Sequence, residues 1–113
     1  MATKEGIIKK TILSFLYTRR NVSTFPVSTT GVFDPVSKRF RKAVNRVGTP
    51  DILCCVGGKF LALEVKSEIG KLSESQRDII KEIERCGGIA RVVRSVEEVR
   101  EILSEIERSL KEL

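Results

Sequence analysis

Two apolar runs joined by a pair of glycines constrain this chain more than any other feature. Residues 51–56 and 59–66 are mostly apolar, and Gly57-Gly58 separates them. A two-residue glycine turn between such runs predicts an antiparallel β-hairpin. The far ends of its two strands meet, so Asp51 at the start of the first strand should lie close to Glu64 near the end of the second.

The polar residues at this end of the hairpin predict a binding site. Side chains alternate along a strand, so Glu64 and Lys66 point the same way and Val65 points to the other face. Two acids and a lysine on an apolar sheet are costly unless they bind something, and a divalent cation and a phosphate are the obvious ligands. Two simpler interpretations remain open: Asp51 could cap a turn after Pro50, and Lys66 could form a plain ion pair.

Length and composition, with 41% apolar and 32% charged residues, favour one globular domain spanning residues 1–113, and the order of its expected elements, given below, places it in the α/β class. The sequence contains no apolar run of about 18 residues and no apolar block at its N-terminus, so we expect an intracellular, cytoplasmic protein without a membrane partner. There is no histidine. The three cysteines, Cys54, Cys55 and Cys86, lack C-x-x-C spacing, so we expect buried, reduced thiols and no zinc.

Positive charge is concentrated in the first half of the chain. Residues 1–50 carry ten Lys or Arg against two Asp or Glu, whereas residues 51–113 carry eleven against thirteen. The densest run, residues 38–42, lies just before the acidic pair. Such a patch favours a polyanionic partner, although a solvated charged loop explains the run alone equally well.

Periodicity and capping signals predict the order α-β-β-β-α-β-α and a mixed sheet flanked by helices. Residues 3–17 should form a helix capped by Thr3, and Ser-x-x-Gln and Ser-x-x-Glu capping boxes should begin helices at Ser73 and Ser95. The remaining predictions are an edge strand in residues 22–33, a basic loop in 34–49, the hairpin, a helix end at Gly87-Gly88 and a parallel strand in 89–93.

Two further residues have both structural and functional interpretations. Gln76 ends a capping box but also follows Lys66 by one short loop, so it could reach the site. Glu5 lies in the first turn of a helix, where any acid is favourable.

Residues 48–51 (Gly-Thr-Pro-Asp), 63–66 (Leu-Glu-Val-Lys) and 70–76 (Gly-Lys-Leu-Ser-Glu-Ser-Gln) together resemble the VRR-NUC family. This is the virus-type replication-repair branch of the PD-(D/E)xK nucleases. Residues 87–99 resemble that family's closing strand and helix. The resemblance implies a restriction-endonuclease-like αβββαβ core and a metal-dependent endodeoxyribonuclease.

The resemblance also implies roles for individual residues. Asp51 and Glu64 would bind Mg²⁺ or Mn²⁺, Glu5 would act on the metal through water, and Lys66 and Gln76 would be catalytic. Apart from the resemblance, the Val65 carbonyl could be a further metal ligand, because it stands between Glu64 and Lys66 in the chain. Stand-alone relatives look like phage or bacterial homodimers that resolve four-way (Holliday) junctions. The expected partners are therefore branched DNA and a second copy of the chain, with no small-molecule cofactor.

Seven basic residues are the predicted DNA-phosphate contacts: Arg19, Arg20, Lys38, Arg39, Arg41, Lys42 and Arg46. The alternatives are a nuclease for linear, flap or restriction-type substrates, and a non-catalytic DNA-binding module. A scaffold protein that binds a partner through its C-terminal helix is the weakest of the options.

Overall fold

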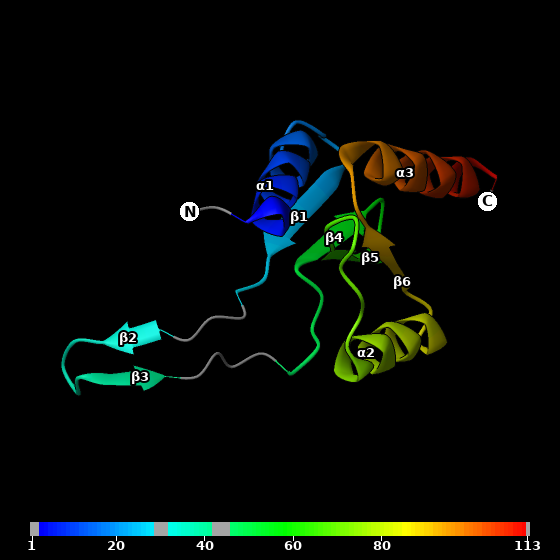
Figure 1. Cartoon of the computed structure of the whole chain (residues 1–113). Coiled ribbons are helices and arrows are strands. Elements are labelled where there is room, and N and C mark those ends of the chain that lie inside the picture. The colour runs from blue at the N-terminus through cyan, green and yellow to red at the C-terminus, as the bar shows by residue number, and fades with distance from the viewer. Residues whose placement is uncertain (1–2, 29–31, 42–45, 113) are drawn as a thin grey trace.

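The computed structural model of the chain describes residues 3–28, 32–41 and 46–112. Its centre is a four-stranded mixed sheet with the strand order β1-β4-β5-β6. Helices α1 and α3 cover one face of this sheet and α2 covers the other, as Figure 1 shows. The predicted α/β class and the mixed sheet flanked by helices are therefore confirmed.

The elements follow in the order α1 (Lys4–Leu16), β1 (Val22–Pro26), β2 (Val32–Asp34), β3 (Arg39–Arg41), β4 (Ile52–Val56), β5 (Lys59–Val65), α2 (Glu74–Arg85), β6 (Ile89–Val93) and α3 (Val96–Lys111).

The predicted hairpin is formed by β4 and β5, which pair antiparallel from Ile52 opposite Leu63 to Val56 opposite Lys59. Gly57 and Gly58 have φ angles of 56° and 86°. Positive φ at both central residues is the requirement of the type I′ turn, and glycine meets it without steric cost. The register brings Asp51, one residue before β4, to the end of the hairpin where Glu64 and Val65 lie.

Helix α2 forms the crossover to a parallel neighbour, since β6 pairs parallel with β5. Its start is the predicted capping box: Ser73 Oγ accepts the Gln76 N–H at 3.1 Å, and Gln76 Oε1 accepts the Ser73 N–H at 2.9 Å. Helix α3 departs from the prediction. Ser95 caps the helix, because its Oγ accepts the Glu98 N–H. A complete capping box also requires the Glu98 carboxylate to accept the Ser95 N–H, but it accepts the Arg94 N–H, so this half of the second predicted box is wrong.

The core lies mainly between the sheet and the α1–α3 face. It is built from aliphatic side chains at helical spacing on the helices and from the inward positions of the strands. Its fully buried members include Ile12, Leu16, Ile52, Leu63 and Val99. Packing of this kind fixes α1 against β5, which matters for the site described below.

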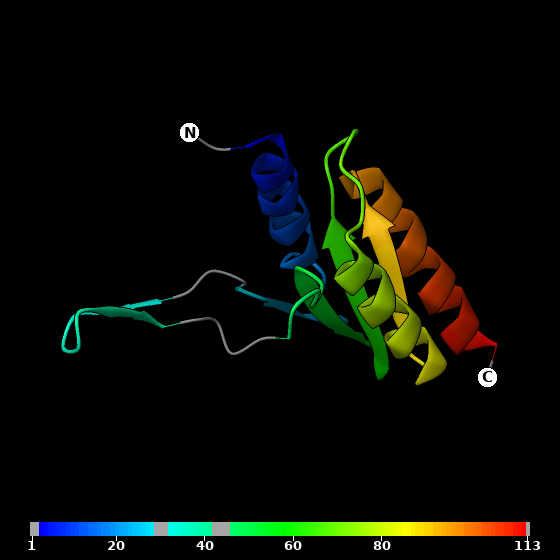
Figure 2. The ribbon, with the colours of Figure 1, turned by 60° about the horizontal axis from the view of Figure 1, so that its bottom comes forward.

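The predicted basic loop over 34–49 is wrong in part, because residues 32–41 form a second, two-stranded sheet. Here β2 pairs antiparallel with β3, and this hairpin (the arm, residues 32–41) projects from the body of the molecule (Figures 1 and 2). Asp34 closes its turn, accepting the Val36 N–H at 3.0 Å and the Ser37 hydroxyl at 2.9 Å. The predicted edge strand is correspondingly shorter, and β1 ends at Pro26 on the sheet edge.

The expected burial of all three thiols is also wrong. Cys54 is buried inside β4, but Cys55 and Cys86 are exposed, and all three are free. Cys55 follows Cys54 directly, so the strand alternation turns it to the opposite, open face. Of the helices in the described part of the chain, none is both long and apolar enough to span a bilayer.

Candidate active site

Asp51 is held in place by its main chain and its side chain. The Val27 N–H donates to the Asp51 carbonyl at 2.8 Å, which extends the β1–β4 ladder by one step. The Val65 N–H donates to Asp51 Oδ2 at 2.9 Å. The preceding Pro50 is fully buried. The Asp51 side chain, 18% exposed, therefore has one oxygen engaged by the backbone of β5 and the other turned toward α1.

Glu64 is the one charged or polar residue among those described that is fully buried, at 3% exposure. Its Oε1 atom has no hydrogen-bond partner in the described part of the chain. The pKa of Glu64 is raised to about 9, first by burial and then by a hydrogen bond with Asp51 and repulsion from Asp51 and Glu5, while the charge of Lys66 opposes the rise. A buried carboxyl with one unpartnered oxygen is costly in a stable core and is common at binding and catalytic sites.

Lys66 follows β5 directly. Its N–H donates to the Val93 carbonyl at 3.0 Å, so β6 fixes the backbone of this residue. Its side chain is half-buried and passes over Gly70, where a β-carbon would lie 3.3 Å from Lys66 Cδ. The charge of Lys66 acts on Glu64 and lowers its pKa, which places the ammonium within electrostatic range of the acidic pair.

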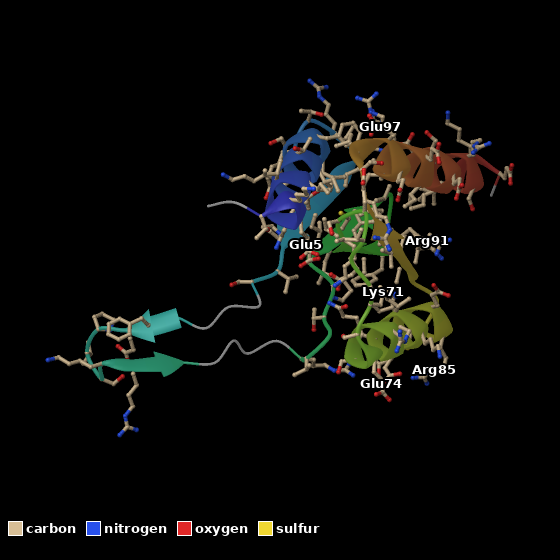
Figure 3. The ribbon with its side chains drawn as sticks, viewed as in Figure 1. Glu5, Lys71, Glu74, Arg85, Arg91 and Glu97 are labelled. Carbon is tan, nitrogen blue, oxygen red and sulfur yellow. The ribbon has the colours of Figure 1, made fainter. Side chains whose placement is uncertain are left out.

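Helix α1 brings two more charged residues to this end of the hairpin. Glu5 contributes to the raised pKa of Glu64, and Figure 3 shows its side chain on α1 beside the central strands. Lys9 Nζ lies 3.8 Å from Asp51 Oδ1. The sequence analysis missed Lys9, although its place four residues after Glu5 puts both on one face of α1 and could have revealed it.

The segment before Asp51 is fixed to the start of α2. At Gly48, where φ is 90°, an added β-carbon would lie 2.4 Å from the Ser75 carbonyl oxygen. Arg46 donates to both carboxylate oxygens of Glu82, at 2.6 and 3.3 Å. Gln76 is therefore brought near the loop that carries Asp51, while its Oε1 remains committed to the capping box. Its amide nitrogen has no hydrogen-bond partner within the described ranges.

The seven basic residues predicted to contact DNA phosphates lie in different parts of the structure, and some of them have acidic partners. Lys38 and Arg39 are exposed on the arm, whereas Arg41 belongs to β3 and Lys42 lies outside the described residues. Arg19 pairs with Glu107 of α3 at 3.2 Å, and Arg46 pairs with Glu82, so both already have acidic partners. Arg20 is exposed beyond the C-terminal end of α1, at the opposite end from Glu5.

The donor set fits a hard divalent cation. Asp51 and Glu64 offer carboxylate oxygens, and the unpartnered Oε1 of Glu64 is a buried acceptor. The described residues contain no preformed cluster of three or more Asp, Glu, Cys or His for a metal. A site with two carboxylates, completed by water and phosphate oxygens, is the usual arrangement for Mg²⁺.

Comparison with known proteins identifies a family and a fold. The family model for the VRR-NUC domain matches residues 32–97. One solved structure, described as a VRR_NUC domain, is similar with a TM-score of 0.67 and 23% identity over 91% of this chain and 97% of that one. A second, a VRR_NUC domain protein, gives a TM-score of 0.61 and 14% identity over 98% and 91%. No curated protein sequence matches the chain.

Proposed function

The chain belongs to the VRR-NUC family, and from this premise we propose that it is an Mg²⁺- or Mn²⁺-dependent endodeoxyribonuclease that cuts four-way (Holliday) junctions. Membership of the family implies a nuclease that acts on DNA. The metal, the branched substrate and the residue roles below are our proposal. So is a cytoplasmic location.

One observation carries the metal-dependent reaction: Glu64 is buried beside Asp51 with an oxygen that no described group satisfies. Burial raises the pKa of this residue because nothing nearby compensates its charge fully. A divalent cation would supply that compensation and would displace the proton. Held by Asp51 and Glu64, such a cation would supply Lewis-acid polarisation of a phosphodiester and would make a water molecule more acidic.

The protein residues have separate tasks in this reaction. Asp51, oriented by the Val65 N–H, and Glu64, held by β5, would hold the metal with the Val65 carbonyl, and Glu5 would hold a water beside it. Lys66 would stabilise the negative charge that builds up on the phosphate oxygens as the bond breaks. The free amide of Gln76 would orient the attacking water while its carbonyl keeps α2 in place.

The symmetry of the substrate supports a homodimer. A four-way junction must be cut at two related positions, and each chain offers one Asp51–Glu64 pair. A two-fold dimer would present both pairs at once. The exposed Lys38 and Arg39 on the arm would contact phosphates outside the junction centre.

Cleavage of end-labelled four-way, flap and linear DNA in Mg²⁺, Mn²⁺ and EDTA tests the proposal. Asp51→Asn is the informative variant, because its amide keeps an oxygen that can accept the Val65 N–H. Asp78→Asn, an exposed acid on α2, is the matched control. Metal-dependent cutting of the four-way DNA that is lost only in Asp51→Asn supports the proposal.

The other outcomes identify the alternatives. If linear or flap DNA is cut in preference to the four-way junction, the chain is an end-trimming or restriction-type nuclease and not a junction resolvase. Binding without cutting in either metal would indicate a DNA-binding module. A monomeric mass by light scattering, with and without DNA, would overturn the dimer.

A further inference from the structure

The connection between β5 and α2 carries an apolar side chain for which the chemistry above has no use. Ile69 is 89% exposed, although it is only three residues beyond Lys66. Figure 2 shows this connection projecting past the end of the sheet, at the same end as the start of α1. An isoleucine at the tip of a turn beside a catalytic lysine contributes nothing to the core.

The turn that presents Ile69 is rigidly held. Gly70 N–H donates to the Ser67 carbonyl at 3.2 Å, which closes a β-turn with Glu68 and Ile69 at its centre. Arg94 Nη1 then donates to the Ser67 carbonyl and, at 2.9 Å, to the Gly70 carbonyl. One guanidinium on the β6–α3 connection therefore holds both ends of the turn, and the side chain of Ile69 is presented outward at little further entropic cost.

The surroundings of the turn favour a nucleic acid as its partner. Lys66 precedes the turn and Lys71 follows it in the chain, and Figure 3 shows Lys71 on the connection that leads to α2. Phosphates would lie against these cations. Glu68, at the centre of the turn, would repel a phosphate but accepts well from the amino group of a cytosine. An apolar tip with an acid beside it and cations around it matches the face of a base pair rather than the sugar-phosphate backbone.

We propose that Ile69 is a wedge that packs against an unstacked base pair next to the scissile phosphate, and that Arg94 is its positioning residue. The inference rests on the proposed nuclease function and adds the feature of DNA that is recognised. Apolar side chains of this size are inserted at kinked base steps by DNA-bending proteins. A base pair at the centre of a branched DNA is separated from its stacking neighbour more easily than one in the interior of a linear duplex, so the wedge would unstack it at a lower cost.

Fluorescence of 2-aminopurine placed at the branch point tests the wedge, because it rises when the base is unstacked. The 113-residue chain is added in Ca²⁺ to DNA that is checked to remain uncut, and cleavage in Mg²⁺ is measured separately. We expect Ile69→Ser to lose most of the fluorescence rise and about tenfold of the preference for four-way over linear DNA. Ile69→Met should retain both.

Two further variants complete the test. Val36→Ser removes an aliphatic side chain that is 92% exposed on the arm, and it should leave the fluorescence rise unchanged. Arg94→Met should reduce the rise while Ile69 is still present, because the turn is no longer held.

Each other outcome overturns a defined part of the inference. An equal rise for the wild type and Ile69→Ser, with cleavage intact, removes the wedge and leaves the nuclease function standing. If Val36→Ser loses as much of the fluorescence rise as Ile69→Ser does, the wedge role of Ile69 is also ruled out. An unchanged rise in Arg94→Met removes the role of Arg94 alone. Failure of the wild type to bind any DNA overturns the proposed function and the wedge with it.

Discussion

A β-carbon on Gly48 would lie 2.4 Å from the carbonyl oxygen of Ser75, so the loop before Asp51 and the first turn of α2 are in backbone contact. This contact ties the β4–β5 hairpin to the helix that carries Gln76. Because the neighbouring atom is backbone rather than the end of a flexible side chain, the helix or the loop must move to admit any other residue.

Gly48→Ala should therefore destabilise the protein by about 2 kcal/mol more than Gly58→Ala, as measured by urea unfolding. Both glycines have positive φ, of 90° and 86°, but nothing lies within 4 Å of the β-carbon position at Gly58. The difference between the two variants isolates the backbone contact from the cost of the left-handed conformation. If both variants lose the same free energy of unfolding, the backbone of Gly48 and Ser75 moves apart without cost.

Glu64→Gln should stabilise the metal-free protein at pH 8. The pKa of Glu64 is raised from 4.5 to about 9, so folded and unfolded chains are both protonated below pH 4.5 and no penalty exists there. Between pH 4.5 and 9 the unfolded chain ionises and the folded chain does not, so wild-type stability falls. We expect the free energy of unfolding of Glu64→Gln to exceed that of the wild type by on the order of 2 kcal/mol at pH 8 and to equal it at pH 4.

Unfolding in EDTA across this pH range checks that prediction, with the exposed Glu105→Gln as the matched control. A stability difference between Glu64→Gln and the wild type that stays constant from pH 4 to 8 would rule out a raised pKa at Glu64.

Mn²⁺ should raise the melting temperature of the wild type, and more strongly at pH 8.5 than at pH 6.5, since binding must displace the Glu64 proton. When the free Mn²⁺ concentration is a hundred times the dissociation constant, binding raises the free energy of unfolding by about 2.7 kcal/mol. Calorimetry in buffers of different ionisation enthalpy should count close to one proton released per metal at pH 7. Asp51→Asn should abolish the stabilisation, and a metal response preserved in that variant would place the site elsewhere.

Two substitutions at Gln76 should separate its structural role from its catalytic one. Gln76→Glu keeps an oxygen to accept the Ser73 N–H and loses the amide donor. It should unfold within about 0.5 kcal/mol of the wild type but cleave at least tenfold more slowly. Gln76→Ala should lose activity and also roughly 1 kcal/mol of stability. Full activity in Gln76→Glu would confine this residue to the helix cap.

The exposed cations of the arm should determine part of the salt dependence of DNA binding. Replacing Lys38 and Arg39 together by glutamine should lower the slope of log K against log salt by about 2, the value for two phosphate contacts. Affinity measured between 50 and 200 mM KCl gives the slope. An unchanged slope in the double variant would show that the arm does not bind the phosphate backbone.

The parts of the fold that could be predicted are those whose signals are local. The glycine pair, the alternation in β4 and β5, and the Ser73 box each determine geometry within a few residues, so the hairpin, its register and α2 followed from the sequence. The arm did not. Its strands are three residues each, too short for an alternating pattern to stand out, and the Asp34 turn between them closes through side-chain hydrogen bonds that composition does not reveal.

The site shows the same division between local and tertiary information. The proximity of Asp51 to Glu64 follows from hairpin register, whereas the contact of Lys9 with Asp51 and the hold of Arg94 on the 67–70 turn depend on how α1 and the β6–α3 connection pack. The ion pairs of Arg19 and Arg46 are also tertiary, so net charge could not distinguish cations with acidic partners from those on the exposed arm.

The chain leaves and rejoins the main sheet at adjacent points around the arm. Pro26 is opposite Ile52, and the Val27 N–H bonds to the Asp51 carbonyl, so the excursion from β1 to β4 begins and ends within one ladder step. An insert with such closely spaced ends behaves as an interchangeable module. Grafting a related arm in place of residues 32–41 should exchange the outer contacts proposed for DNA, and the segment from Arg46 to Asp51 that is fixed to α2 would stay in place.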